Sequence, residues 1–233
     1  MRTLGLLGGM SWESSIEYER IIHERVRERL GGVASADLLI RSFNFADIEE
    51  LQAAGRWDDA GELLARAARS LVAAGAEAVV LCTNTMHVVA DVIEQAIDVP
   101  FLHIADATGE AVSAQHLDTV GLLGTRFTME MPFYAERLRE QHGLTVFVPD
   151  AAERAFVHDV IYNELVRGIV SDASRTAYVT IVDELVARGA GGLIAGCTEI
   201  ELLLRPTDIA VPLFPTARLH AEAAAAWAMG DAP

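Results

Sequence analysis

"VVLCTNTMH", residues 79–87, is the stretch of sequence that decides the fold. It opens with an apolar, partly β-branched run, which is typical of a strand buried on both faces of a sheet. Small polar residues follow, as is typical where a chain leaves a strand. Because neighbouring side chains of a strand point to opposite faces, Cys82 and Thr83 cannot both point toward one site. The stretch therefore predicts a buried strand whose end carries a single reactive side chain.

Similar apolar runs recur along the chain and alternate with helical patterns. We expect strands at residues 3–7, 37–42, 78–82, 100–103, 119–123, 145–148, 192–195 and 212–214. We expect helices at residues 14–30, 58–74, 106–115, 129–141, 176–188 and 216–229. This alternation predicts an α/β fold in which mostly parallel sheets are flanked by helices.

Three short motifs occur twice, in the same order and at nearly equal spacings. They are GLLG at 5–8 and 121–124, CT at 82–83 and 197–198, and VP at 99–100 and 211–212. The repetition predicts two pseudo-symmetric lobes: residues 1–98 plus 210–233, and residues 99–209. We expect the last helix to pack on the first lobe. Since ligands of α/β proteins bind beyond the carboxyl ends of strands, we expect the active site in the cleft between the lobes.

Charge and composition disfavour several classes of function. The formal net charge of −16 disfavours nucleic acid as a partner, because the chain would repel phosphate groups. The longest apolar stretch, residues 71–82, is too short to span a membrane and contains Glu77. With only two cysteines and no export signal, we expect reduced thiols and a cytoplasmic protein without membrane contact.

The chain contains no lysine, since all 18 basic residues are arginine. A Schiff base between the chain and pyridoxal phosphate is therefore excluded, as is a P-loop, which needs a Gly-Lys pair. The seven histidines lack the spacing of metal ligands, so we predict no metal site.

The glycine-rich segment LGLLGGMS, residues 4–11, does not match the dinucleotide-binding pattern. We expect it to form a tight turn whose backbone N–H groups at Gly9, Met10 and Ser11 point into the cleft. Such a turn suits a small carboxylate. A plain connection between a strand and a helix is the alternative.

Polar side chains follow the two strands that carry the CT pairs. Asn84 and Thr85 in the first lobe, and Thr198 and Glu199 in the second, are expected to open helices. Helix N-termini bind carboxylates well, although ordinary capping residues look the same in sequence. Cys197 stands between a strand and a helix, and a helix N-terminus lowers the pKa of a thiol. We therefore expect Cys197 to be a thiolate base, the alternative being a buried structural cysteine.

GLLGGMSWES at 5–14, NTMH at 84–87 and GCTE at 196–199 together resemble the aspartate/glutamate racemases. The resemblance covers the chain from its first strand to its last helix. It is nearest to the broad-specificity or L-aspartate/glutamate-specific bacterial enzymes. It implies a racemase that needs no cofactor, acts on a small-molecule amino acid and forms a homodimer. In such enzymes one residue removes the α-proton from one face and another returns a proton to the opposite face.

The resemblance also implies roles for particular residues. Aligned on Asn84-Thr85, it puts Thr83 where the family usually has its first catalytic cysteine, whereas the repeated CT motif favours Cys82. It implies Cys197 as the thiolate base and Thr83 as the opposing proton donor or relay. The substrate contacts that it implies are Met10, Gln52, Asn84, Thr85, Thr125, Thr128, Thr198 and Glu199. Val166 stands where many aspartate racemases have lysine, which leaves the choice of amino acid open.

Two further functions fit the same residues. A single well-placed cysteine also suits a decarboxylase of malonate-type acids, because that reaction needs only one protonation. A protein that kept the binding site but lost one base would bind an amino acid without catalysis.

Overall fold

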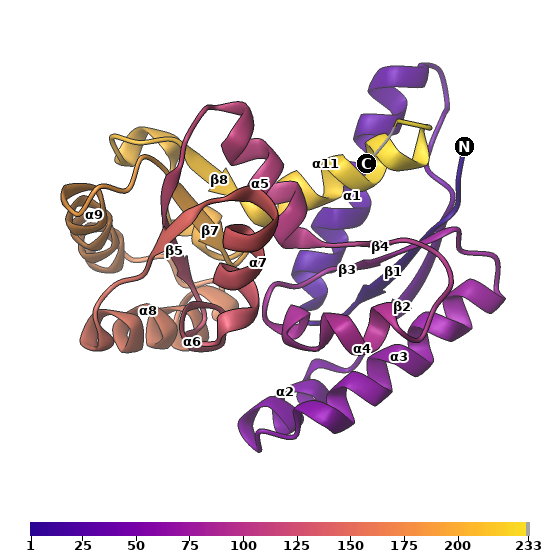
Figure 1. Cartoon of the computed structure of the whole chain (residues 1–233), viewed down its shortest axis with the longest axis horizontal. Helices are drawn as coiled ribbons and strands as arrows, with labels where there is room; N and C mark the ends of the chain where they lie inside the picture. Colours follow the sequence, from indigo (N-terminus) through magenta and orange to yellow (C-terminus); the bar gives the residue numbers. More distant parts are fainter. Residues whose placement is uncertain (232–233) are drawn as a thin grey trace. The chain divides into compact units, whose positions relative to one another are not determined.

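A computed structural model of the chain describes residues 1–231. Within these residues the chain forms two compact units, each built on a four-stranded parallel sheet (Figure 1). The strand orders are β2-β1-β3-β4 and β6-β5-β7-β8, so the second unit repeats the topology of the first. The predicted α/β class with helix-flanked parallel sheets is confirmed, and every expected strand is present to within one or two residues of its predicted ends.

The first unit comprises Met1–Ile104 and the chain from Ala217 onward. Its elements are β1 (Leu4–Gly8), α1 (Trp12–Leu30), β2 (Leu38–Ser42), α2 (Phe45–Ala53), α3 (Trp57–Ala73), β3 (Ala78–Leu81), the 3₁₀ helix η1 (Thr85–Val89), α4 (Ala90–Glu94), β4 (Phe101–Leu102) and α11 (Thr216–Ala228).

Alternate side chains along β3 and the residue after it point to opposite faces of the first sheet. Ala78, Val80 and Cys82 pack with α1 and α11 on one face. Val79 and Leu81 pack with α3 on the other. A strand buried on both faces needs apolar residues at every position, which explains why β3 has no polar residue before Thr83.

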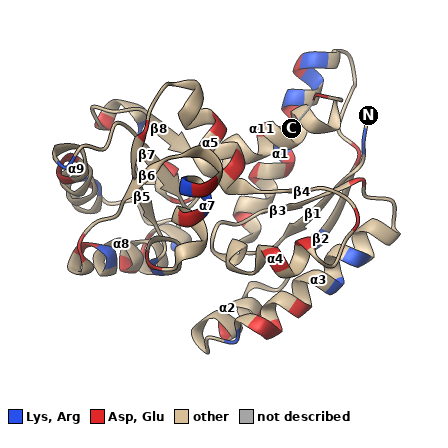
Figure 2. Ribbon diagram, viewed as in Figure 1, with Lys and Arg blue, Asp and Glu red and all other residues tan. Residues whose placement is uncertain are grey.

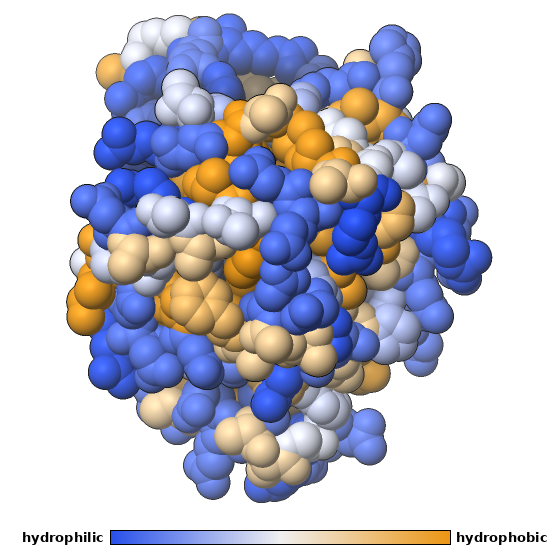
Figure 3. Space-filling model, turned by 90° about the vertical axis from the view of Figure 1, so that its left-hand side faces the viewer, coloured by the Kyte–Doolittle hydropathy of each residue, from blue (hydrophilic) through white to orange (hydrophobic). Residues whose placement is uncertain are grey.

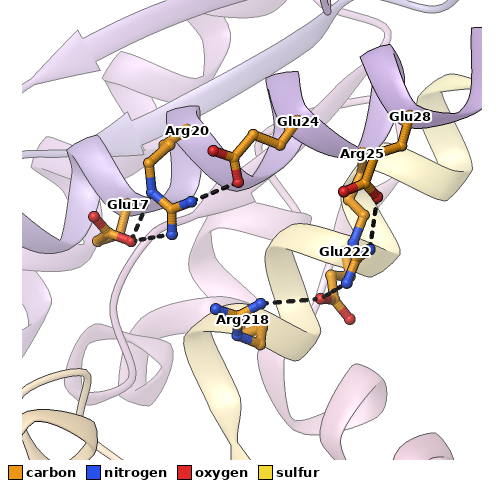
Figure 4. Close-up of polar contacts among 7 residues, drawn as sticks. All are labelled: Glu17, Arg20, Glu24, Arg25, Glu28, Arg218 and Glu222. Carbon is orange, nitrogen blue, oxygen red and sulfur yellow. Dashed lines mark hydrogen bonds and ion pairs between the residues drawn. The ribbon is translucent and has the colours of Figure 1, made fainter. Parts of the chain in front are cut away.

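Helix α11 returns from the end of the chain to pack beside α1, as predicted. Five of its alanines pack against the sheet and α1; they are Ala217, Ala221, Ala224, Ala225 and Ala228. Figure 4 shows the solvent edge of this contact, where Glu222 of α11 accepts one hydrogen bond from Arg25 of α1 at 2.5 Å and pairs with Arg218 at 3.6 Å. Small side chains allow the close approach, and exposed ion pairs of this kind add little stability.

The second unit comprises Ala105–Thr216. Its elements are α5 (Ile104–Ala114), β5 (Thr119–Gly124), α6 (Arg126–Glu130), α7 (Pro132–His142), β6 (Thr145–Phe147), α8 (Ala151–Asn163), the 3₁₀ helix η2 (Leu165–Arg167), α9 (Asp172–Ala187), β7 (Leu193–Gly196), α10 (Ile200–Leu203), the 3₁₀ helix η3 (Pro206–Asp208) and β8 (Leu213–Pro215).

Helices α8 and α9 cover one face of the second sheet, where they pack on Leu123, Leu193 and Ala195. Helices α5 and α7 pack against each other. Their contact includes a buried hydrogen bond in which Tyr134 donates to Thr108 at 3.2 Å.

The boundaries of the units differ from those expected from the repeats. The structure changes unit between 104 and 105 and again between 216 and 217, whereas the sequence placed these points at 98/99 and 209/210. The cause is strand pairing. Strand β4 pairs with β3 in the first sheet, and β8 pairs with β7 in the second. A strand belongs to the unit whose sheet it completes, even where the repeated VP motif precedes it.

One predicted helix is two helices in the structure. Residues 129–141 divide between α6 and α7, with Met131 in an extended conformation at the break. Pro132 opens α7, because proline lacks the N–H that a helix interior needs but fits its first turn. Helices α2 and α8 add to those expected from the sequence.

Charged residues lie mainly on the helices, and the inner strands β1, β3, β5 and β7 carry none (Figure 2). Acidic side chains outnumber arginines by 34 to 18. On the face shown in Figure 3, hydrophilic side chains surround smaller areas of apolar ones. Across residues 1–231, every helix is too short or too polar to cross a membrane.

Candidate active site

The polar residues singled out in the sequence form two groups, one at the carboxyl edge of each sheet. The hydrogen-bond register shows which members of the groups correspond. In the first sheet Leu7 pairs with Leu81, and in the second Leu123 pairs with Ala195. Leu7 and Leu123 are the same position of the repeated GLLG motif. Leu81 therefore corresponds to Ala195.

Counting onward from that pair gives the correspondence at the strand ends. Cys82 corresponds to Gly196, and Thr83 corresponds to Cys197. The two CT motifs are thus one residue out of structural register. The register agrees with the alignment on Asn84-Thr85 rather than with the repeated CT motif.

Cys82 and Thr83 differ in environment as well as in register. The Cys82 side chain is 0% exposed and packs among apolar residues of the first unit. Burial raises the pKa of its thiol far above the ordinary value. Thr83 is half-buried, and its backbone N–H donates to the carbonyl of Leu81 at 2.9 Å. Of the two, only Thr83 has access to a ligand.

Asn84 and Thr85 lie in the turn that leaves β3, and both are buried. This turn continues into the 3₁₀ helix η1 rather than the α-helix expected from the sequence. Gln52 of α2 is also buried, and its amide donates to the sulfur of Met86 at 3.0 Å. The Gln52 carbonyl oxygen is buried without a hydrogen-bond partner among residues 1–231. Such an oxygen is costly to leave unpaired, so it is a candidate acceptor for a ligand N–H group.

The glycine turn after β1 differs from expectation in one respect. The N–H of Gly9 donates to the hydroxyl of Ser15 at 2.7 Å, so it is occupied within the chain. Gly9 has φ of +85°, and a Cβ there would lie 2.3 Å from the carbonyl oxygen of Phe43. Glycine is therefore required by both conformation and space. The residue that sequence reasoning missed is Ser15, whose signal is its place one helical turn after Ser11. Met10 follows the turn and packs in the same apolar cluster as Met86.

The group of the second unit centres on Cys197, Thr198 and Glu199. The Cys197 thiol donates to a Glu199 carboxylate oxygen at 2.8 Å, and the Thr198 hydroxyl donates to the same oxygen at 3.0 Å. Glu199 is 9% exposed, whereas Cys197 and Thr198 are half-buried. A thiol and a carboxylate joined in this way can exchange a proton.

The pKa of Cys197 is raised well above its ordinary value, which corrects the expectation of a lowered one. Burial is the larger cause, and the negative charge of Glu199 is the next. The helix that follows, α10, spans only Ile200–Leu203. One turn of helix carries too small a dipole to outweigh burial and a carboxylate in contact. Cys197 is therefore a neutral thiol at pH 7 in the ligand-free protein.

Thr125 and Thr128 lie beside this group. Thr125 follows β5 and caps α6, where its hydroxyl accepts the N–H of Thr128 at 3.4 Å. The preceding residue, Gly124, pairs with Gly196, and a Cβ on Gly124 would lie 3.0 Å from the Gly196 carbonyl oxygen. The two glycines let the strand ends approach closely, which places Thr125 near Cys197.

Val166 and Arg167 lie in η2 and are both exposed. The Val166 side chain is 38% exposed and belongs with Ile169 and Val170 to the apolar residues at the surface of the second unit. No cation occupies position 166, as the sequence indicated.

Comparison with known proteins identifies the family to which the chain belongs. Residues 7–224 match the model of the Asp/Glu/hydantoin racemase family, so the chain belongs to that family. It is 52% identical to a protein of Yersinia pestis provisionally assigned as an Asp/Glu racemase, with a TM-score of 0.94 over 98% of this chain and 100% of that one. It is 32% identical to an aspartate racemase homologue of Pyrococcus horikoshii OT3, with a TM-score of 0.85 over 98% and 100% of the two chains.

A more distant structure shares the fold. Glutamate racemase of Francisella tularensis, in complex with D-glutamate, matches with 17% identity and a TM-score of 0.66, over 98% of this chain and 81% of that one. The sequence resemblance to the racemases is thus confirmed, and family membership supports amino-acid racemase activity for this chain.

Proposed function

We propose that this protein interconverts the enantiomers of aspartate, glutamate or a related amino acid without a cofactor, using Cys197 and Thr83 as the pair that acts on the α-proton. The observation that carries the proposal is the structural correspondence of these two residues at the ends of β7 and β3. A racemase must act on both faces of the α-carbon. Two equivalent strand ends, one from each half of a duplicated fold, carry one such group each.

The first step uses the contact between Cys197 and Glu199. Glu199 accepts the thiol proton along the 2.8 Å hydrogen bond, and the resulting thiolate removes the α-proton of the substrate. The proton bound to carbon becomes the new thiol proton, and its electron pair stays on the α-carbon. Because the pKa of Cys197 is high, its thiolate is a strong base once formed, which suits a weakly acidic C–H group.

The second step delivers a proton to the opposite face. The Thr83 hydroxyl donates its proton to the α-carbon and regains one from water. The hydroxide left behind is neutralised by the proton that Glu199 took up in the first step, so Glu199 and Thr83 both return to their starting states. The negative charge that develops on the substrate carboxylate is stabilised by N–H and hydroxyl donors, for which Asn84, Thr85 and Thr198 are the candidates. The unpaired carbonyl oxygen of Gln52 suits the substrate ammonium group. Met10, Thr125 and Thr128 complete the proposed contacts.

Exchange of the α-proton in D₂O tests the proposal directly. Purified protein without added pyridoxal phosphate is given L-aspartate or L-glutamate. Loss of the α-proton is followed by NMR, and the chirality of the same samples is measured. We expect deuterium uptake together with the D-enantiomer. Because the equilibrium constant of a racemisation is one, kcat/KM must be equal for the two enantiomers.

Other outcomes identify other functions. Carbon dioxide release from a substituted malonate, without exchange in amino acids, would replace the racemase with a decarboxylase. Binding of aspartate or glutamate in calorimetry without any exchange would indicate a binding protein that has lost catalysis.

The oligomeric state and the cellular location remain predictions from the resemblance and the sequence. We expect a homodimer, which sedimentation equilibrium tests, and a cytoplasmic protein, which cell fractionation tests.

A further inference from the structure

His87 makes two hydrogen bonds that join the Thr83 turn to another segment of the first unit. Its Nδ1 atom lies 2.7 Å from the carbonyl oxygen of Thr83. Its Nε2 atom lies 3.2 Å from the backbone nitrogen of Ile104, the first residue of α5. The side chain is 2% exposed, so water does not compete for either bond.

The two partners determine where the proton of the imidazole lies. A backbone N–H group can only donate, so Nε2 must accept from Ile104 with its lone pair. A carbonyl oxygen can only accept, so Nδ1 must carry the hydrogen that Thr83 receives. His87 is therefore the neutral Nδ1–H form. A second proton, on Nε2, would face the N–H of Ile104 and break that bond.

Aromatic neighbours hold the His87 ring in this orientation. The ring of His103 packs edge-on at 4.5 Å, and that of Phe101 lies at 5.6 Å. His220 lies at 5.9 Å and is itself held between the Tyr18 hydroxyl at 2.9 Å and the Leu102 carbonyl oxygen at 2.7 Å. With its ring packed on these neighbours and both nitrogens bonded, His87 has no freedom to turn without losing contacts.

We propose that His87 is a positioning residue for Thr83: its neutral imidazole clamps the Thr83 carbonyl to the start of α5 and so fixes where the Thr83 hydroxyl meets the substrate. This inference rests on the proposed function, because it concerns the group that acts opposite Cys197. In this role His87 acts through Thr83 and transfers no proton itself. A shift of about 1 Å in a reacting group can slow a reaction by about 10²-fold, so the clamp matters for catalysis.

Two substitutions separate the two halves of the clamp. In His87→Asn the side-chain amide stands near the place of Nδ1 and can still donate to Thr83. In His87→Gln the amide oxygen stands near the place of Nε2 and can accept from Ile104 while the bond to Thr83 is lost. We expect inversion to slow by about 10- to 100-fold in His87→Gln, with a smaller loss in His87→Asn, and the fall to be in kcat rather than KM.

The measurement is deuterium uptake and inversion in D₂O, started separately from the L- and the D-enantiomer. From the enantiomer whose α-proton faces Cys197, His87→Gln should keep uptake with retention of configuration while inversion falls. From the other enantiomer, uptake and inversion should fall together. A fraction of misfolded protein would lower uptake and inversion equally from both enantiomers. Uptake that is kept from one enantiomer and lost from the other therefore identifies a positioning role. His116→Asn, at an exposed histidine, is the matched control and should leave all four unchanged.

Equal losses of inversion in His87→Asn and His87→Gln, or an equal fall in deuterium uptake from the two enantiomers, would overturn the inference. A wild-type protein that exchanges no α-proton would overturn the proposed function and this inference with it. If both variants fail to fold, ¹⁵N NMR of the imidazole in the wild-type protein decides. A protonated Nδ1 with a hydrogen-bonded, unprotonated Nε2 supports the clamp, and the opposite tautomer refutes it.

Discussion

At the scale of single residues, the main result is that Thr83, and not the cysteine beside it, corresponds to Cys197. Cys82 points into the apolar core of the first unit, where it contributes packing. Thr83 comes one residue later, in the turn that follows the end of β3 at Leu81. A shift of one residue reverses the face of a side chain, so the register alone separates a core residue from a site residue.

Substitutions at these neighbours test that result. Thr83→Ala removes the hydroxyl and should reduce inversion by at least about 10²-fold, as is usual when a group that transfers a proton is lost. Thr83→Ser keeps the hydroxyl and should retain much of the rate. Cys82→Ala should stay active and lose about 1 kcal/mol of stability, because it leaves only a small cavity. Racemase assays and urea unfolding measure both effects. An inactive Cys82→Ala with an active Thr83→Ala would show that the register assignment is wrong.

The contact between Cys197 and Glu199 predicts a second result at this scale. Glu199→Gln removes the negative charge that opposes ionisation, so the pKa of Cys197 should fall, although burial still keeps it above the ordinary value. Alkylation by iodoacetamide needs the thiolate, so its pH midpoint at Cys197 should move to lower pH. Racemisation should fall, because the acceptor of the thiol proton is gone.

Glu201→Gln is the matched control, since Glu201 affects the pKa of Cys197 in the same direction but less than Glu199. Mass spectrometry of the peptide that contains Cys197 reports alkylation of each variant. An unchanged midpoint in Glu199→Gln would show that burial alone sets the pKa.

At the scale of elements, the turn after β1 depends on one glycine. Gly9→Ala adds a Cβ at 2.3 Å from a backbone oxygen and at positive φ, so we expect a loss of about 3 kcal/mol or more in the free energy of unfolding. Gly55→Ala is the control, because Gly55 also has positive φ (+66°) but open space around it. It should lose only about 1 kcal/mol. Equal losses in the two variants would mean that the contact with Phe43 relaxes.

Most elements could be predicted from the sequence, because their signals are local. Each strand is a short apolar run between turn residues, and each long helix repeats its apolar residues every three or four positions. The break at Pro132 has a local cause that the helical pattern concealed. The 3₁₀ geometry of η1 has no comparable local signal, and the hydrogen bond from Ile104 to His87 ties it to a segment distant in sequence.

At the scale of the whole molecule, the first unit is discontinuous and depends on α11 for part of its core. Ala221 is fully buried there, so Ala221→Leu should overpack the contact with α1 and cost about 1–3 kcal/mol. Arg25→Ala breaks the ion pairs that Arg25 makes with Glu28 and Glu222 (Figure 4) and should cost under about 1 kcal/mol. Urea unfolding followed by tryptophan fluorescence measures both. A larger cost for Arg25→Ala would mean that the ion pairs hold the helix in place.

The sequence by itself determined the α/β class, the positions of the strands, the duplication and the resemblance to the racemases, because apolar periodicity and repeated motifs are properties of neighbouring residues. It also brought Thr83, Cys197, Thr198 and Glu199 to the ends of strands. Only the tertiary structure decided that Thr83 corresponds to Cys197 and that the pKa of Cys197 is raised. It also decided that β4 and β8 are the edge strands of the first and second sheet, and that His87 bonds to the Thr83 turn. These properties depend on hydrogen bonds between strands distant in sequence, and on the burial and charge that surround a side chain in the folded protein.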